Sequence, residues 1–255
     1  LTDLLGFNFL TYPKEVRNEI VTNMKLPNGI AKNEALLDNI FSLFSCINLK
    51  IPIFICGKTG CSKSLSFSLL YQSMKGKYSD NEFYKQYPRL YVNSYQGSLT
   101  SNSLEIKTIF ERAKKIAKMS DEEQNKQIQD NVNNLNEGKQ ENTVKKEEER
   151  IYGEENKSNK DIISVILFDE MGLAEISPNN PLKVIHSELD NNNDEIGFVG
   201  ISNWTLDASK MNRGVHLSIQ EPEKEDLKNT ATTIANGIYN IFDKSYNDII
   251  QNLNR

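Results

Sequence analysis

The sequence predicts an α/β fold in which helices flank a five-stranded parallel sheet. Two observations predict this fold. Short, continuous runs of apolar residues recur along the chain, and such runs are typical of strands that are buried on both faces. Between these runs lie longer segments whose apolar residues repeat at helical spacing. Because strands that alternate with helices favour a parallel sheet, we expect the ligand site beyond the carboxyl ends of the strands.

The first 50 residues are predicted to form a helical flank that packs on the sheet domain. Their apolar residues are densest at Leu36, Leu37, Ile40, Phe41, Leu43 and Phe44. This spacing predicts a helix that ends near Asn48. The apolar run 51–56 follows directly and predicts the first strand.

The middle of the chain continues the alternation of strands and helices. Residues 65–74 predict a helix, and residues 90–93 predict a short second strand. A second helix of the domain is expected where apolar residues again repeat at helical spacing, at Leu104, Ile106, Ile109, Phe110, Ala113, Ile116 and Ala117.

The last third of the chain completes the predicted sheet. Residues 162–168 predict a third strand, and residues 196–201 and 215–219 predict the fourth and fifth. A helix is expected after Asn180 and Pro181, because proline is well tolerated in the first turn of a helix. The apolar residues of this helix are Leu182, Ile185 and Leu189.

The negative charge of the chain is concentrated in one segment. The 255 residues carry a formal charge of −5, from 30 basic and 35 acidic side chains. Residues 120–160 alone hold eleven acidic, seven basic and only six apolar side chains. This composition predicts a disordered insertion, to which no chemistry is assigned. The near-neutral remainder argues against direct nucleic-acid binding, which needs a clustered basic face.

The sequence contains no pattern that indicates a membrane span or a secretory signal. The longest apolar runs, 51–56 and 165–168, fall far short of the roughly 18 residues that a transmembrane helix requires. Because the chain opens on Leu1 without a signal peptide, we expect it to be a piece of a longer protein. Three cysteines, Cys46, Cys56 and Cys61, lack metal-ligand spacing. An odd number of this kind favours a reducing compartment, so the expected location is cytoplasmic.

A glycine-containing loop separates the first predicted strand from the helix that follows it. This is the context in which a P-loop binds phosphate, because successive backbone N–H groups and a helix N-terminus can point at the phosphate oxygens. Lys63 would add a full positive charge, and Ser64 would place its hydroxyl on Mg²⁺. Ser62 departs from the usual pattern, because a glycine normally precedes the lysine. The residues expected to bind ATP are Gly57, Lys58, Thr59, Gly60, Cys61, Ser62, Lys63, Ser64 and Leu65.

Two carboxylates follow the apolar run 165–168 and match a Walker B motif. In this interpretation Asp169 holds Mg²⁺ and Glu170 polarises the attacking water. Two acidic residues at the end of a strand are common, so the pair alone would be weak evidence. Together with a P-loop, which we expect on the neighbouring strand, they indicate a nucleotide site.

Two further residues are candidates for a catalytic role. Asn203 ends the fourth predicted strand, where its amide could orient the water and report on the γ-phosphate, although it could equally be a turn residue. Arg213 precedes the fifth strand. As a finger onto a neighbouring subunit's phosphate it would contribute roughly 10³ to 10⁵ in rate. An ordinary surface or interdomain salt bridge is the alternative for Arg213, and the sequence does not decide between them.

These motifs, in this order, resemble the pattern of AAA+ ATPases. More narrowly, about residues 29–218, apart from the insertion, resemble an ATPase module of the mysterin family. The segments that carry this resemblance are Gly29-Ile-Ala-Lys-Asn-Glu-Ala-Leu36, Asn39-Ile-Phe41, Ile51-Pro52, Ser62-Lys63-Ser64-Leu65, Leu167-Phe-Asp-Glu170, Gly172-Leu-Ala-Glu175, Ser177-Pro178, Pro181-Leu-Lys183, Gly200-Ile-Ser-Asn203-Trp204 and Lys210-Met-Asn-Arg-Gly214.

The resemblance implies an AAA+ P-loop core at 51–222, preceded by the helical flank and followed at 223–255 by the start of a truncated helical lid. It also implies a parent chain that is a giant cytosolic E3 ubiquitin ligase with a dynein-like series of AAA+ modules. The expected partners are then neighbouring AAA+ modules in the same chain and, through the parent protein, the ubiquitin machinery. The ligase activity itself would lie outside these residues.

Three functions remain open from the sequence. The first is an ATP-hydrolysing module that couples nucleotide state to conformational change, with Glu170 as the water activator. The second is a module that binds ATP without hydrolysing it, and the departure at Ser62 is its supporting feature. The third is a P-loop kinase, which the scarcity of arginine, six in all, disfavours. A GTPase is disfavoured because no Asn-Lys-x-Asp element follows the Walker B strand.

Overall fold

A computed structural model describes residues 12–118, 162–191 and 195–253. The predicted insertion at 120–160 lies outside these residues. Within them, all five predicted strands are present and form one parallel sheet. The strands are β1 (Ile53–Cys56), β2 (Arg89–Gln96), β3 (Ile162–Asp169), β4 (Gly197–Ser202) and β5 (Val215–Ser218).

The strand order differs from the sequence order, and it corrects one expectation. The sheet runs β2-β3-β4-β1-β5, so β4 lies between β1 and β3. The strand before the predicted P-loop, β1, and the strand before the predicted Walker B carboxylates, β3, are therefore not neighbours. The sequence analysis expected them to be neighbours, and this expectation was wrong. Val199 of β4 pairs with Ile53 of β1 on one side and with Leu167 of β3 on the other. This register places the carboxyl ends of the three strands along one edge of the sheet.

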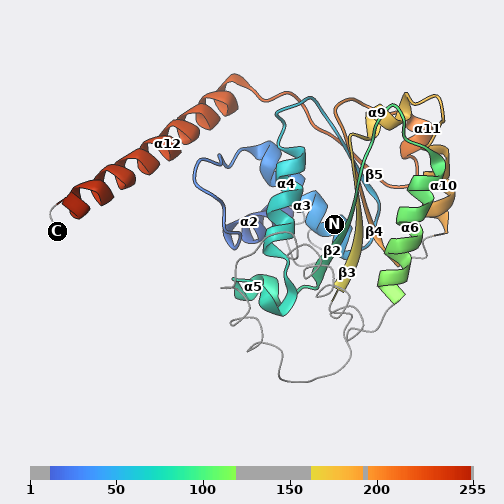
Figure 1. Ribbon diagram of the computed structural model, residues 1–255, viewed down its shortest axis with the longest axis horizontal. Coiled ribbons are helices and arrows are strands. Elements are labelled where there is room, and N and C mark those ends of the chain that lie inside the picture. Colours follow the sequence, from blue (N-terminus) through green and yellow to red (C-terminus); the bar gives the residue numbers. More distant parts are fainter. Residues whose placement is uncertain (1–11, 119–161, 192–194, 254–255) are drawn as a thin grey trace, which may run out of the picture.

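Helices cover both faces of the sheet and produce three layers (Figure 1). On one face lie α2 (Tyr12–Thr22), α3 (Glu34–Asn48) and α4 (Lys63–Ser73), with the short helices η1 (Gly76–Tyr78) and α5 (Glu82–Lys85) after them. On the other face lie α6 (Ser103–Lys118) and α10 (Lys183–Asp190), with the short helices α9 (Met171–Glu175) and α11 (Ala208–Met211) near them.

The strand β1 shows why its sequence is a continuous apolar run. Ile53 and Ile55 pack in the core cluster shared with α3 and α4. Phe54 and Cys56 point to the opposite face and pack in the cluster shared with α6 and α10. Since alternate residues of a strand point to opposite faces, a strand between two helical layers needs apolar residues at every position.

The strand β2 is longer than its predicted extent of 90–93. Eight of its residues pair with β3, from Arg89 opposite Ile162 to Gln96 opposite Asp169. The apolar pattern underestimates this strand because β2 is at the edge of the sheet, where its polar residues Ser94 and Gln96 are exposed.

The C-terminal helix α12 (Lys224–Leu253) leaves the three-layered core and extends away from it (Figure 1). Several apolar side chains on it stay about half exposed or more, namely Leu227, Ile234, Ile238 and Tyr239. One residue contacts the core closely: a Cβ atom on Gly237 would lie 2.9 Å from the Cα atom of Gly29. Among the described residues, no helix has both the length and the apolar character needed to cross a membrane.

Candidate functional site

The loop between β1 and α4 has a backbone shape that favours glycine at two positions. Gly60 has a φ of +87°, and no other atom lies within 4 Å of the place where its Cβ would be. Ser62 has a φ of 57° and a ψ of 18°, in the left-handed region, directly before α4. That conformation costs a residue with a side chain roughly 1–2 kcal/mol. The serine therefore adopts the shape that glycine would have, at a cost in backbone strain.

Lys63 is the first residue of α4, and its side chain folds back onto the loop. It is only 6% exposed, and its ammonium donates hydrogen bonds to the carbonyls of Gly57 at 2.6 Å and Lys58 at 2.7 Å. Burial lowers the pKa of Lys63 below that of an ordinary lysine, while Cys61, Glu170 and Asp169 act in the opposite direction. The ammonium is thus buried close enough to the Asp169 and Glu170 carboxylates for their charge to stabilise it.

Glu170 turns the chain sharply at the end of β3. Its φ is 50°, again in the left-handed region, and its backbone N–H donates to Asp169 Oδ1 at 2.8 Å. The amide of Asn203, at the end of β4, donates to both carboxylate oxygens of Glu170, at 2.9 and 2.8 Å. The structure therefore brings together Glu170, which the sequence analysis expected to activate the attacking water, and Asn203, which it expected to orient that water.

The remaining P-loop residues are more exposed. Lys58, Thr59 and Gly60 form the exposed tip of the loop, and Ser64 and Leu65 are exposed on the first turn of α4. Lys58 forms an ion pair with Glu221, in the segment that connects β5 to α12. The loop is thereby joined to the segment that leads into the C-terminal helix.

Arg213 is not brought to this edge of the sheet. It precedes Val215, which pairs with Ile53 at the amino end of β1, whereas the predicted phosphate loop follows the carboxyl end of β1. Its guanidinium forms an ion pair with Asp190, with an Nε to Oδ1 distance of 2.6 Å. Arg213 therefore does not line the site formed by Lys63, Asp169, Glu170 and Asn203.

Two residues that support the site were missed by the sequence analysis. Gly97, just after β2, donates its N–H to the Asp169 carbonyl at 2.8 Å, and a Cβ on Gly97 would lie 2.3 Å from the Glu170 carbonyl oxygen. Asn39, in α3, donates its amide to the carbonyl of Cys61 at 3.1 Å. The signals available in the sequence were a glycine shortly after a predicted strand and a polar residue inside the apolar stripe of a helix.

These residues fit a nucleotide with Mg²⁺. The space above Gly60, the N-terminus of α4 and the Lys63 ammonium suit phosphate. Ser64 and Asp169 offer oxygen ligands, which Mg²⁺ prefers. Among the described residues, no group of three or more His, Cys, Asp or Glu side chains could hold a metal ion. An ion at Ser64 and Asp169 would therefore take its other ligands from phosphate and water, as Mg²⁺ usually does.

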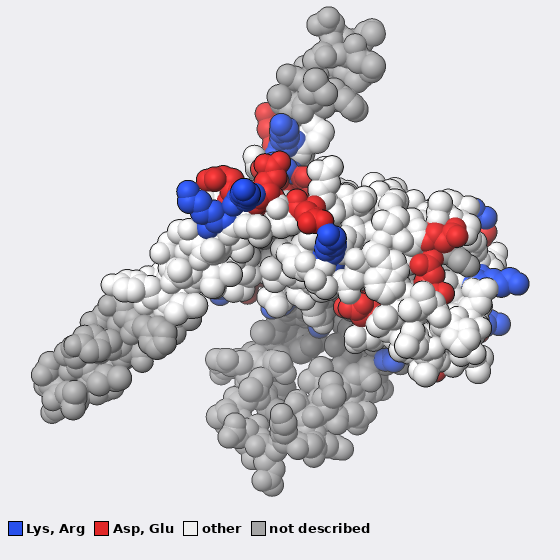
Figure 2. All heavy atoms as spheres, turned by 90° about the horizontal axis from the view of Figure 1, so that it is seen from above, with Lys and Arg blue, Asp and Glu red and all other residues white. Residues whose placement is uncertain are grey.

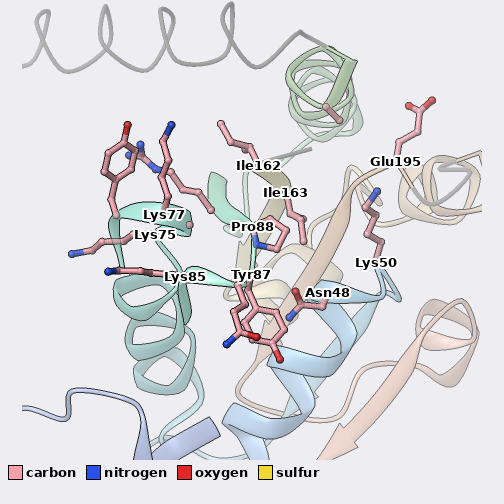
Figure 3. Close-up of a pocket in the computed structure, with 15 residues that line it drawn as sticks. Asn48, Lys50, Lys75, Lys77, Lys85, Tyr87, Pro88, Ile162, Ile163 and Glu195 are labelled. Atoms are coloured by element: carbon pink, nitrogen blue, oxygen red, sulfur yellow. The ribbon is translucent and has the colours of Figure 1, made fainter. Parts of the chain in front are cut away.

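A separate cavity of about 570 Å³ lies at the opposite, amino-terminal edge of the sheet. Basic side chains line much of it. Figure 3 shows Lys75, Lys77 and Lys85 on one side and Lys50 with Glu195 on the other. None of the motif residues lines this cavity. This cavity and the motif-bearing edge are thus distinct parts of the molecule.

Comparison with known proteins agrees with the motifs. A family model described as the RNF213 AAA domain matches residues 29–146 and 136–226. The chain is 33% identical over 224 residues to the E3 ubiquitin-protein ligase rnf213-beta of Danio rerio, and 32% identical over 217 residues to the human E3 ubiquitin-protein ligase RNF213. These matches cover 84% and 82% of this chain but only 4% of each relative, so the chain spans a small part of their length.

The solved structure of PCH-2 from C. elegans is similar to this chain, and the match covers 83% of this chain and 43% of the PCH-2 chain. The sequence identity is 15% and the TM-score is 0.36, so the description of the fold rests on the strand order and the two helical layers and not on this match.

Proposed function

The chain belongs to the RNF213 AAA domain family, and from this premise we propose that it binds and hydrolyses ATP as one module of a larger chain. The observation that carries the proposal is the meeting of three strand ends at one edge of the sheet. Lys63 follows β1, Asp169 and Glu170 end β3, and Asn203 follows β4 between them. A phosphate-binding ammonium, two carboxylates and an orienting amide are the groups that phosphoryl transfer to water requires.

ATP binding would use the loop from Gly57 to Leu65. In the present structure the Lys63 ammonium donates to two loop carbonyls, which hold it close to the loop until phosphate oxygens can replace them. Ser64 and Asp169 would hold Mg²⁺, which neutralises phosphate charge when it is bound.

Hydrolysis would depend on Glu170. A carboxylate there can accept a proton from the attacking water, and general base catalysis of this kind contributes about 10²- to 10⁴-fold in rate. Asn203 would orient Glu170 and the water together, since its amide already contacts both carboxylate oxygens.

Arg213 would serve a different nucleotide. Because it lies at the amino-terminal edge of its own sheet, we assign it to the site of a neighbouring AAA+ module. The relatives are named as E3 ubiquitin-protein ligases. We therefore place this module in a cytoplasmic parent chain in which nucleotide state drives conformational changes that are coupled to ubiquitin transfer, with the ubiquitin machinery as the partner of that parent.

The test is the substitution Glu170→Gln, compared with Lys63→Ala. We expect Glu170→Gln to retain ATP binding and to lower phosphate release at least a hundredfold. Lys63→Ala should lose binding itself. Equilibrium binding of a fluorescent ATP analogue and a phosphate-release assay on the chain and its parent separate the two effects.

A second candidate function is an ATP-binding module without turnover. The observation in its favour is that Asn203 occupies both oxygens of the Glu170 carboxylate. If the unsubstituted protein retains ATP, releases no phosphate and is insensitive to Glu170→Gln, this second function replaces the first.

A further inference from the structure

A buried amide on α3 holds the phosphate loop from behind. Asn39 is 1% exposed and is the polar member of the buried face of α3, which otherwise consists of apolar residues. Its amide nitrogen donates to the carbonyl oxygen of Cys61 at 3.1 Å. The bond joins a helix that precedes the sheet to a loop 22 residues further along the chain.

A buried polar side chain at this position lowers the stability of the fold unless it finds a hydrogen-bond partner. Burying an amide costs free energy unless it is hydrogen-bonded, and an apolar residue would fill the same place in the core without that cost. The Cys61 carbonyl is the partner that offsets this cost. What distinguishes Asn39 from its apolar neighbours is therefore the contact with the loop.

The position of the bond within the loop matters. Cys61 immediately precedes Ser62, which adopts the left-handed conformation with a φ of 57° and has no side-chain capping bond. In a planar trans peptide the C=O and the following N–H point in opposite directions. A donor that binds the Cys61 carbonyl from α3 therefore directs the Ser62 N–H away from α3.

Rotation of this peptide plane is the simplest way for Ser62 to relieve its strain. Such a rotation would turn the Ser62 N–H out of the row of donors that a phosphate-binding loop presents. The next carbonyl, that of Ser62, is held separately by the backbone N–H and the hydroxyl of Ser66, at 2.8 and 2.6 Å. Asn39 is thus the side chain that restrains the peptide before Ser62.

We propose that Asn39 is a positioning residue that holds the Cys61–Ser62 peptide in its phosphate-binding orientation, and so compensates for a serine where glycine would be free of strain. The inference rests on the proposed nucleotide binding. It adds a residue outside the P-loop and Walker motifs to the group that determines affinity for the phosphates of ATP.

The experiment is a double-mutant cycle on nucleotide affinity. The dissociation constant of a fluorescent ATP analogue is measured for the unsubstituted chain, Asn39→Ala, Ser62→Gly and the double variant. We expect Asn39→Ala to weaken binding about tenfold, as expected for the loss of one hydrogen bond. In the Ser62→Gly background the same substitution should weaken binding less than threefold, because glycine keeps the orientation without support.

The control is Ile40→Val, at the next position of α3, where the side chain is fully buried in the apolar core. It should lower the melting temperature and leave the affinity unchanged.

If Asn39→Ala does not fold, Asn39→Thr, which is similar in volume and carries a shorter donor, replaces it with the same expectations. An Asn39 variant that lowers the melting temperature but not the affinity would show a purely structural role and overturn the proposal. If Asn39→Ala lowers the affinity equally in the unsubstituted and the Ser62→Gly backgrounds, Asn39 does not compensate for the strain at Ser62.

Failure of nucleotide binding in the unsubstituted chain would refute the proposed function, and with it the effect of Asn39 on ATP affinity, but it would not test whether Asn39 holds the loop. Hydrogen exchange of the nucleotide-free chain keeps the two apart. Loss of the Asn39 amide should speed amide exchange at Ser66, whose N–H donates to the Ser62 carbonyl, and leave exchange in β4 unchanged. If exchange at Ser66 is unaffected, Asn39 does not hold the loop.

Discussion

The contact between Asn203 and Glu170 links two strands through a single side chain. The Asn203 amide is placed so that one nitrogen reaches both oxygens of the carboxylate, at 2.9 and 2.8 Å. A hydrogen bond to a charged group contributes about 1.5–3 kcal/mol, more than a bond between neutral groups. The orientation of Glu170 therefore depends on a residue that need not touch the nucleotide.

Replacement of Asn203 by alanine tests this dependence. We expect turnover to fall roughly 10- to 100-fold while ATP affinity stays within about twofold, because the lost bond orients the base and not the phosphates. Single-turnover kinetics and equilibrium binding measure the two quantities. Asn229→Ala, at an exposed asparagine on α12, is the control and should change neither. Equal losses of affinity and turnover for Asn203→Ala would contradict an orienting role.

Two buried thiols give a prediction that depends on pH. Burial raises the pKa of Cys46, and burial likewise raises that of Cys56. A group whose pKa is higher in the folded state favours folding below its ordinary pKa, and this contribution is lost as the pH rises above it. At pH 8 both thiols should therefore stay protonated and react slowly with iodoacetamide until urea unfolds the chain. Peptide mass spectrometry of native and unfolded samples checks this, and equal labelling in both would contradict it.

At the residue scale, the sequence predicted the groups that belong to local motifs. Lys63, Asp169 and Glu170 follow predicted strands, so their edge of the sheet could be inferred before the structure was known. Asn39 and Gly97 could not be found in this way, because each acts through contact with a segment distant in the sequence. The sequence left Arg213 open between a finger and a salt bridge, and the structure adds the partner Asp190.

At the scale of elements, α12 contacts the core through a point where two backbones nearly touch. The site where a Cβ of Gly237 would lie is 2.9 Å from Gly29 Cα and 3.0 Å from Gly29 N. Glycine in a helix interior lowers helix stability by about 1 kcal/mol relative to alanine. Gly237 thus weakens its own helix and in return permits close approach to the loop before α3.

Gly237→Ala should separate these two effects. We expect a more stable α12 but a weaker contact with the loop, because the new methyl group meets backbone atoms that cannot give way. Hydrogen exchange should become slower within α12 and faster at residues 28–30. Asn236→Ala, at the adjacent exposed position, adds similar helix propensity without the clash and should leave residues 28–30 unchanged. Unchanged exchange at 28–30 in Gly237→Ala would contradict the contact.

The sequence predicted the long elements better than the short ones. The helix predicted to end near Asn48 ends at that residue, and the five predicted strands are all present. Helices such as α5, α9 and α11 were missed because four or five residues are too few to show a period. The helical spacing in α12 was visible, but the departure of the helix from the core depends on tertiary contacts.

At the scale of the whole molecule, the two edges of the sheet carry different groups. The carboxyl edge holds the phosphate loop, the two carboxylates and Asn203, and the amino edge holds Arg213 and the basic cavity. Figure 2 looks down on the carboxyl edge, where acidic and basic side chains are interspersed among uncharged residues. Among the described residues, no broad basic surface is visible on this face.

This separation predicts that Arg213 acts between modules. In the parent chain, Arg213→Ala should lower ATP turnover substantially, with an upper limit near the 10³- to 10⁵-fold known for arginine fingers. ATP affinity of the 255-residue chain alone should stay unchanged. Asp190→Asn removes the ion pair but keeps the arginine, so it should preserve turnover and serves as the control. Reduced affinity in the isolated chain would instead place Arg213 in its own site.

The glycine at the end of β2 has a consequence for inherited variation. Gly97 supplies no charge and no side-chain ligand, yet even one methyl group there would meet the carbonyl of Glu170 at 2.3 Å. Any substitution at 97 would displace the residue on which turnover is proposed to depend. Selection for turnover would therefore act against substitutions at position 97 as well as at position 170, although Gly97 takes no part in the chemistry.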